Sequence, residues 1–572
     1  MLTRDFDFLK DKYMELLLPT LLMLLSDKIC LIADAAIIGL FFIDSSFLSS
    51  IDLSTPFIYF SAILYTLFGV GGSLLALRTK ADQNDEKANF YFTFAIVGVI
   101  ISNIVFIAFS MTIGNDLVIL LYDVPSEIYE TFLSYNNILL FYFPFICYIL
   151  VLGYFARSDG YPKLPFISLL IANVSNIIIS LILMGVFHLG VEGSALGSVI
   201  GYAIGSVYIS TYFLKKDRDF FLITNIKIKE SFSTLIEFIK NTPEIISRTF
   251  LSAKVVFFTY LSSQFLGIAG LMALLIYDNS ETLVYMFLSA IGKVMSPIVA
   301  VFYKEKDYEA VEYIIKKSLK QVLIISIPIS ILFLVYPELF VYLFTLDDPA
   351  EAEVICMALR ITSLGLIGRC LSILLSNYAQ AIEKNKLSYF MNLSEEFIFA
   401  FGGALVLTSI FGGVGIWYAI VLADTVPVII YFIITQLYMN KNKDRIKSLF
   451  MLQESNTVTW TYKRGNDDED SYVSVEKKKF LHKLENMFNK KSPIAIQYIM
   501  DIFDNILEDE EVINIDIIIR YVEDTITITS TYGGKLLNPI SDYDSEKIGE
   551  MGGNVEYSPI LGFNRFYINI PV

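Results

Sequence analysis

The sequence predicts an all-α membrane bundle of twelve transmembrane helices in two six-helix repeats, followed by a small cytosolic α/β domain. Three observations carry this prediction: the apolar composition, the distribution of lysine and arginine among the loops, and an internal repeat. Mean hydropathy is +0.59, with 55% apolar and only 18% charged residues over 572 positions. Soluble globular proteins rarely have this composition, so the main solvent of the chain is lipid.

Apolar stretches of roughly 20 to 28 residues recur along the chain, each long enough to cross the hydrocarbon core of a bilayer. They begin near Glu15, Pro56, Phe90, Thr131, Leu164, Val191, Glu244, Glu281, Ser318, Val354, Leu387 and Gly413. The first follows basic residues but has no small-residue cleavage site. We therefore expect an uncleaved span and not a signal peptide.

Lysine and arginine occur in every second connection between these stretches. Arg78, Arg157, Lys215, Lys304 and Lys384 mark the basic connections, and the alternate ones contain neither residue type. Cytoplasmic loops retain positive charge, so both termini are expected on the cytoplasmic side of a bacterial inner (plasma) membrane.

Charge and cysteine content exclude other classes of protein. The net charge is −16, and no basic surface interleaved with aromatic residues is visible, so a nucleic-acid partner is not expected. The four cysteines lie singly in apolar runs. Their spacing predicts neither a disulfide framework nor a metal site.

The chain repeats itself at a spacing of about 222 to 224 residues, which brings Pro19 onto Pro243. A repeat of six spans keeps the same topology, so two lobes are expected to face a central cavity. A duplicated bundle is typical of transporters, although a scaffold or a receptor would also explain it. The predicted domains are an N-terminal lobe (1–230), a C-terminal lobe (231–443), a linker with a first strand (444–474) and a cytosolic domain (475–572).

Ionisable residues at bilayer depth are costly, so each is a functional candidate. Asp34 lies far inside the first span, with apolar sequence on both sides. In the fifth span Asn173 and Asn176 share one helical face, where their amides either coordinate a cation or join two helices. Ser198 lies among small residues and is either a site residue or a packing contact.

The second half carries its own charged residues at plausible membrane depths. The acids are Glu395, Glu396 and Asp424, and the bases are Lys254, Lys293, Arg360 and Arg369. Ion pairs between helices explain most of them. A cavity acid that binds a cationic substrate or a proton explains the remainder.

Several segments over roughly residues 10 to 440 resemble the multidrug and toxin extrusion (MATE) family of cation-coupled antiporters. Pro19 followed by ADAAIIG is similar to the first helix of that family, and GVGGSLLALRTKADQNDEKAN to its second helix and loop. ARSDGYPKL, NYAQAIEKNK and FGGVGIWYA match further segments. The order and spacing of the segments make the resemblance specific.

The resemblance implies a cation or proton site in the first lobe. Asp34 and Asn176 match the acid and the asparagine of the family's site, and Ser198 replaces a threonine of that site. The second acid of the family falls on Ser180. A single carboxylate favours coupling by protonation or a weaker sodium site, unless the acids of the second lobe take over the coupling.

The tail after residue 443 resembles the histidine-kinase-like (GHKL) ATPase fold in its anti-sigma-factor branch. VINIDIIIRYV and TITITSTY have strand character, and Asp501 and Asn505 are similar to the acid and magnesium-binding asparagine of that fold. The aspartate expected two residues before Gly534 is replaced by Tyr532. We interpret the tail as a degenerate regulatory or docking domain for a cytosolic protein.

The sequence as a whole predicts a secondary active antiporter and not an enzyme. It would export small cationic or amphipathic molecules in exchange for H+ or Na+, with no other cofactor. Two alternatives stay open: a flippase for lipids or lipid-linked glycans, which needs a basic cavity, and a membrane sensor that signals through the tail.

Overall fold

The computed structural model describes most of the helical bundle and part of the tail. The described residues are 6, 9–25, 54–122, 126–223, 228–339, 349–442, 446, 448–452, 457–463, 482, 514–522, 525–532, 542–550, 552–557, 559–560 and 563–571. Asp34, Asp501, Asn505 and Gly534 lie outside these residues, so their predicted roles stay predictions.

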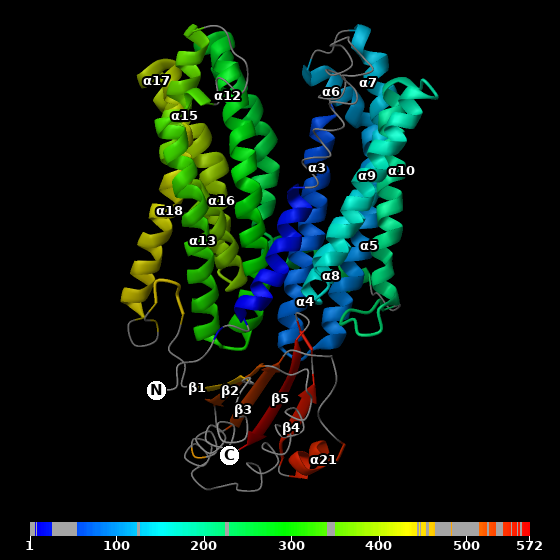
Figure 1. Cartoon of the computed structure of the whole chain (residues 1–572), viewed down its shortest axis with the longest axis vertical. Helices are drawn as coiled ribbons and strands as arrows, with labels where there is room; N and C mark the ends of the chain where they lie inside the picture. Colours follow the sequence, from blue (N-terminus) through cyan, green and yellow to red (C-terminus); the bar gives the residue numbers. More distant parts are fainter. Residues whose placement is uncertain are drawn as a thin grey trace.

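The helices form two groups that lie side by side above one sheet (Figure 1). We call them the first and second lobe, and we call the end of the bundle next to the sheet the sheet end. The first lobe contains a first helix (residues 9–25), α3 (Thr55–Tyr65), α4 (Gly72–Ala81), α5 (Asp85–Phe109), α6 (Asn115–Tyr122), α7 (Ser126–Leu139), α8 (Tyr142–Ser158), α9 (Lys163–Gly185) and α10 (Gly190–Ile209). The second lobe, after the connecting helix α11 (Ile228–Asn241), contains α12 (Glu244–Lys304), α13 (Tyr308–Val335), α15 (Pro349–Ala381), α16 (Asn385–Leu393), α17 (Gly403–Phe411) and α18 (Gly415–Lys441).

The described helices confirm a helical membrane bundle. Nine of them are long and apolar enough to cross a bilayer, and a bent pair around Phe250 gives a tenth. One of the nine, Asn385–Lys441, covers two of the predicted spans and breaks at Gly412, whose φ is 63°. The count of twelve stays a prediction, since most of the first predicted span lies outside the described residues.

The predicted loop between the seventh and eighth spans is wrong in position. The spans predicted to begin near Glu244 and Glu281 leave LLIYDNSE (274–281) as their connection, but these residues are helical and belong to α12. The chain breaks instead at Gly267, which has φ 61° and ψ −142°. Glycine reaches positive φ without a steric cost, so this position turns the chain and leaves Asp278 and Glu281 on a helix.

The tail forms a five-stranded antiparallel sheet with the order β1-β2-β3-β5-β4. The strands are β1 (Thr457–Lys463), β2 (Asn514–Val522), β3 (Thr525–Tyr532), β4 (Asn554–Tyr557) and β5 (Asn564–Pro571), with the helix α21 (Asp542–Glu550) between β3 and β4. The two segments with predicted strand character are β2 and β3, which confirms them as strands. Ile519 pairs with Ile528 and Ile528 with Ile568, so an apolar row crosses the central strands.

Glycines bring α9 and α10 into close contact. A Cβ atom built on Gly197 would lie 2.1 Å from Ser180 Oγ, and one on Gly201 would lie 2.5 Å from the backbone nitrogen of Asn176. Small residues at helix interfaces let backbones approach in this way. The contact fixes the position of the polar residues that α9 and α10 share.

We expect Gly201→Ala to destabilise the protein by about 1 to 3 kcal/mol, because the new methyl group overlaps with backbone atoms that cannot move aside. Thermal unfolding of the purified protein in detergent measures the effect. Gly402→Ala is the matched control, since no atom lies within 4 Å of its Cβ position. Equal unfolding temperatures for the two variants would contradict the close contact.

Candidate functional site

Polar side chains of α9 and α10 converge inside the first lobe. Ser180 donates a hydrogen bond to Asn176 Oδ1 at 3.0 Å, and Ser198 donates to the same oxygen at 3.4 Å. Tyr202 donates to Asn173 Oδ1 at 2.7 Å. All five side chains are buried. The structure thus brings together the predicted residues of this lobe that it describes, in a geometry that also joins the two helices.

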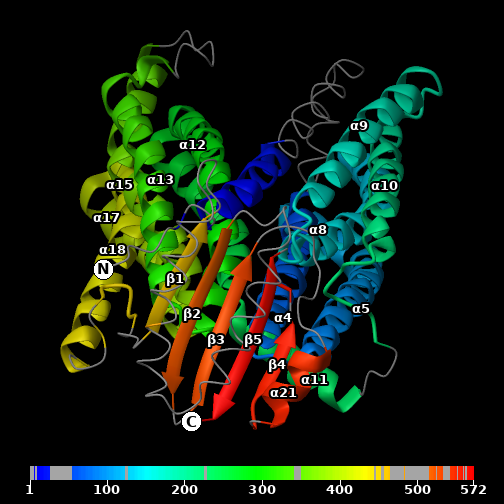
Figure 2. The same cartoon turned by 60° about the horizontal axis from the view of Figure 1, so that its bottom comes forward.

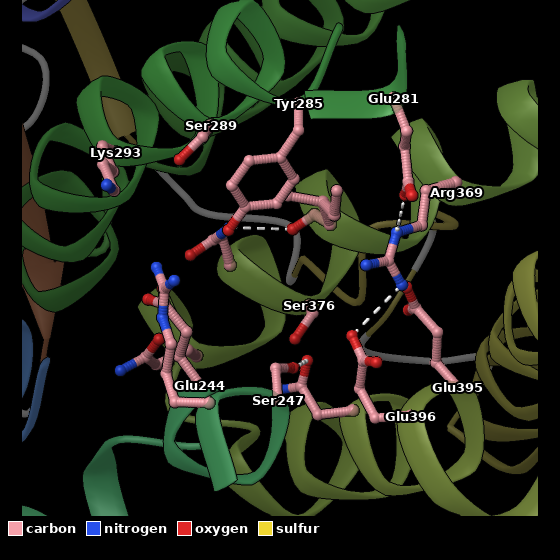
Figure 3. A pocket seen from close by; sticks show the side chains of 15 residues that line it. Glu244, Ser247, Glu281, Tyr285, Ser289, Lys293, Arg369, Ser376, Glu395 and Glu396 are labelled. Carbon is pink, nitrogen blue, oxygen red and sulfur yellow. Dashed lines mark hydrogen bonds and ion pairs between the residues drawn. The ribbon is translucent and has the colours of Figure 1, made fainter. Parts of the chain in front are cut away.

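The second lobe contains a cavity of about 170 Å³ lined by charged and hydroxyl side chains (Figure 3). Its walls come from α12, α15, α16 and the π-helical turn Ser394–Gly402. The titratable residues around it are Glu244, Arg248, Glu281, Tyr285, Lys293, Arg369, Glu395 and Glu396.

Arg369 of α15 binds three of the carboxylates. Its Nε atom lies 3.1 Å from Glu281, and its Nη1 atom lies 3.2 Å from Glu396 and also contacts Glu395. Ser372, one helical turn further along α15, donates a hydrogen bond to Glu395. Guanidinium groups suit this role because their donors are planar and numerous.

Local backbone geometry explains why two successive glutamates both point inward. Glu395 and Glu396 begin the π-helical turn Ser394–Gly402, and both are buried. Wider π-helical turns occur often at functional sites because they redirect side chains. The turn therefore lets Glu396 reach Lys254 Nζ at 2.6 Å while Glu395 faces Arg369.

A smaller cavity of about 40 Å³ adjoins the same ion pairs. Phe258, Leu274 and Tyr277 line it together with the acids Asp278 and Asp424. Asp424 approaches α15 at two glycines, since a Cβ atom on Gly365 would lie 3.0 Å from its Oδ2 atom and one on Gly368 would lie 2.8 Å from its backbone oxygen.

Acids outnumber bases around the two cavities. Among the described residues, six acids line them (Glu244, Asp278, Glu281, Glu395, Glu396 and Asp424), against four bases (Arg248, Lys254, Lys293 and Arg369). Arg360, a predicted membrane base, lies elsewhere and pairs with Glu338 at 2.5 Å, with both side chains about half exposed. The arrangement attracts a positive charge more than a negative one.

The structure places Glu395 and Glu396 at the larger cavity and Asp424 at the smaller one, and it shows the partners of Lys254 and Arg369. Sequence reasoning missed Glu244, Asp278 and Glu281. The last two seemed to be loop acids because the turn was expected beside them. The break at Gly267 that keeps them on a helix is a backbone conformation, which the sequence does not reveal.

The two lobes are joined at the sheet end. Arg78 of α4 donates hydrogen bonds to the backbone oxygens of Gln380 and Ala381 at the end of α15. Lys304 of α12 lies 3.1 Å from Asp82 of the first lobe. Figure 1 shows the helices of the two lobes converging at this end and diverging at the other.

The first helix strengthens this junction. Tyr13 donates a hydrogen bond to Gln321 of α13 at 2.6 Å, and the ring of Phe6 stacks on Tyr313 at 4.5 Å. Buried apolar residues of both lobes form one continuous core here. The sheet end of the bundle is therefore closed.

Two repeated helical lobes in a membrane bundle, one with a buried polar cluster and the other with charged cavities, indicate a membrane transporter as the class of protein. The MatE family model matches residues 19–182 and again residues 243–406, so the chain belongs to the MatE family. The two matches begin at Pro19 and Pro243, the pair that the internal repeat superposes.

Curated relatives and solved structures agree with this family. The multidrug export protein MepA of Staphylococcus saprophyticus is 24% identical over 423 residues, which covers 71% of this chain and 90% of the relative. MepA of Staphylococcus aureus is also 24% identical, over 414 residues, with the same coverage.

Solved transporters share the fold. A multidrug resistance MATE transporter in an outward-facing conformation superposes with a TM-score of 0.68 at 17% identity, over 76% of this chain and 96% of that chain. A transporter of the same superfamily from Pyrococcus furiosus, described as having a binding pocket of reverse polarity, gives a TM-score of 0.67 at 18% identity, with the same coverage.

We expect Arg369→Met to lower stability by about 3 to 5 kcal/mol, because the buried Glu395 and Glu396 and the partly buried Glu281 lose their shared partner. Arg360→Met is the matched control. Its exposed pair with Glu338 contributes about 0 to 1 kcal/mol. Thermal unfolding in detergent should separate the two variants clearly, and equal unfolding temperatures would show that Arg369 does not hold the site together.

Proposed function

We propose that the protein is a secondary active antiporter that exports small cationic or amphipathic organic molecules in exchange for H+ or Na+. The observation that carries this proposal is the excess of acids over bases around the cavities of the second lobe. Membership of the MatE family and the multidrug export proteins among its relatives support it.

Transport would proceed by alternating access between the two lobes. The positions of lysine and arginine in the sequence place the sheet end in the cytoplasm. With that orientation, the contacts of Arg78 and Lys304 close the cytoplasmic side, as in an outward-facing transporter. Substrate release to the outside would occur from this arrangement.

The coupling ion would bind in the first lobe. Asp34 supplies the carboxylate, and Asn176, Ser180 and Ser198 supply neutral oxygen atoms from a buried cluster. One carboxylate with hydroxyl and amide oxygens suits a proton or a sodium ion, since sodium and other hard cations prefer oxygen ligands. The acids of the second lobe, Asp424 among them, are the alternative coupling site.

The two rival functions receive less support. A flippase for anionic headgroups needs a basic cavity, but Arg360 lies outside the cavities and acids predominate within them. A membrane sensor would need a signal carried by the tail. We assign the tail as a degenerate GHKL-like domain, which is cytoplasmic like both termini, and which regulates the bundle or docks a protein.

Uptake of a cationic dye into everted vesicles tests the function. A proton gradient and a sodium gradient are imposed in separate experiments. We expect one of the two gradients alone to be sufficient to drive dye uptake by the wild-type protein. Asp34→Asn should reduce gradient-driven transport at least tenfold, because the amide cannot be protonated and binds cations weakly.

Asp116→Asn serves as the matched control, since Asp116 is exposed on α6. Equal transport by Asp34→Asn and this control would remove Asp34 from the coupling site. Dye movement no faster than in vesicles without the protein would contradict the function itself.

A further inference from the structure

The tail contacts the second lobe through a buried ion pair. Arg565 of β5 pairs with Glu305, the residue directly after the end of α12, and both side chains are almost completely buried. Tyr567, two residues along the same strand, donates a hydrogen bond to Glu305 Oε1 at 2.8 Å. The guanidinium of Arg565 also lies 5.2 Å from the ring centre of Phe302. Removing one member of such a pair leaves an uncompensated buried charge.

The same end of β5 contacts the first lobe. The ammonium of Lys12, on the first helix, lies 5.1 Å from the ring centre of Phe563. Phe563 and Ile560 belong to the apolar core that joins the two lobes at the sheet end. Residues 563 and 565, two positions apart, therefore touch different lobes.

The edge strand β4 also lies close enough to the first lobe for charges there to act on it. Burial raises the pKa of Glu556, the negative charge of Asp85 raises it further, and the positive charge of Lys80 opposes the rise. Lys80 lies in the last turn of α4, and Asp85 is the first residue of α5. Figures 1 and 2 show the sheet lying across the ends of both lobes.

These contacts constrain the transport cycle. An inward-facing state requires the cytoplasmic ends of the lobes to separate, which breaks the contacts of Arg78 and Lys304. A sheet bound to both ends must first release one of them. Contacts that exist in only one of two states shift the equilibrium toward that state.

We propose that the C-terminal sheet is an autoinhibitory clamp that holds the two lobes together at their cytoplasmic ends through Arg565, Tyr567 and Phe563. This inference rests on the proposed transport function and adds a regulatory role for the tail. The Glu305–Arg565 pair is the main lock, because it is the buried charged contact between the described tail and α12. Turnover of the transporter then depends on how often the sheet releases the bundle.

Distances between spin labels at positions 86 and 386 test the clamp on the full-length protein. Glu86 and Lys386 are exposed and lie at the sheet end of the first and second lobe respectively. The labels are introduced as cysteines after the four native cysteines are replaced. In Arg565→Glu, a carboxylate faces Glu305, so we expect the population with long distances to increase at least threefold over wild type.

Three further variants keep the test decisive. Tyr567→Phe removes only a hydroxyl group and should produce a smaller increase in the same direction, even if Arg565→Glu fails to fold. The double variant Glu305→Arg with Arg565→Glu restores an ion pair and should return the distances toward wild type. Glu546→Gln, at an exposed position of α21, is the matched control and should match wild type.

The same variants are then assayed for dye transport, so that the two proposals fail separately. The clamp predicts faster initial transport in Arg565→Glu than in the control. Distances that do not change in Arg565→Glu or Tyr567→Phe, in a protein that transports the dye, overturn the clamp and leave the function intact. Distances that change in a protein that transports no dye support the clamp and overturn the proposed function.

Discussion

The guanidinium of Arg369 organises the interior of the second lobe, because it is bound by carboxylates from two separate segments of the chain. Glu281 comes from α12, and Glu395 and Glu396 come from the π-helical turn after α16. In a bilayer these charges are tolerable only when they face protein or water and are paired. Arg369 therefore ties three helical segments together and defines the cavity at the same time.

The basic side chains around the cavities do not neutralise all of the acidic ones, and this excess of negative charge bears on function. Arg369 and Lys254 together offset two of the negative charges around them, whereas Asp278 and Asp424 add two more nearby. A proton or an organic cation entering the cavity would reduce this excess of negative charge. The same electrostatic imbalance that disfavours an empty site makes it suitable for a positively charged substrate.

The sequence was sufficient to predict the helical bundle, the repeat and three of the six acids that line the cavities in the described residues. The lengths of apolar segments, the charges of loops and the repeated motifs are local or periodic patterns. They can therefore be recognised in the sequence without knowledge of how the helices pack. The pairing of Lys254 with Glu396 joins residues 142 positions apart and depends on how the helices pack. Glu281 was missed for a different reason, because the break at Gly267 depends on a backbone conformation that composition does not reveal.

The contacts that join the two lobes lie at the sheet end, whereas the candidate sites lie inside the individual lobes. The sheet end is held by hydrogen bonds, ion pairs and a shared apolar core, and the tail adds contacts to both lobes there. The charged cavities lie within the second lobe alone, and the polar cluster lies within the first. In the proposed antiporter, coupling between ion and substrate would therefore pass through the relative motion of the lobes.

Equilibrium binding of two probes of equal shape and opposite charge tests the central claim most directly. Tetraphenylphosphonium and tetraphenylborate differ mainly in the sign of their charge, and titration calorimetry on the purified protein measures both. An acid-rich cavity predicts that the phosphonium binds at least tenfold more tightly, which corresponds to about 1.4 kcal/mol. Equal or tighter binding of the borate would contradict this account and favour a site for anionic headgroups.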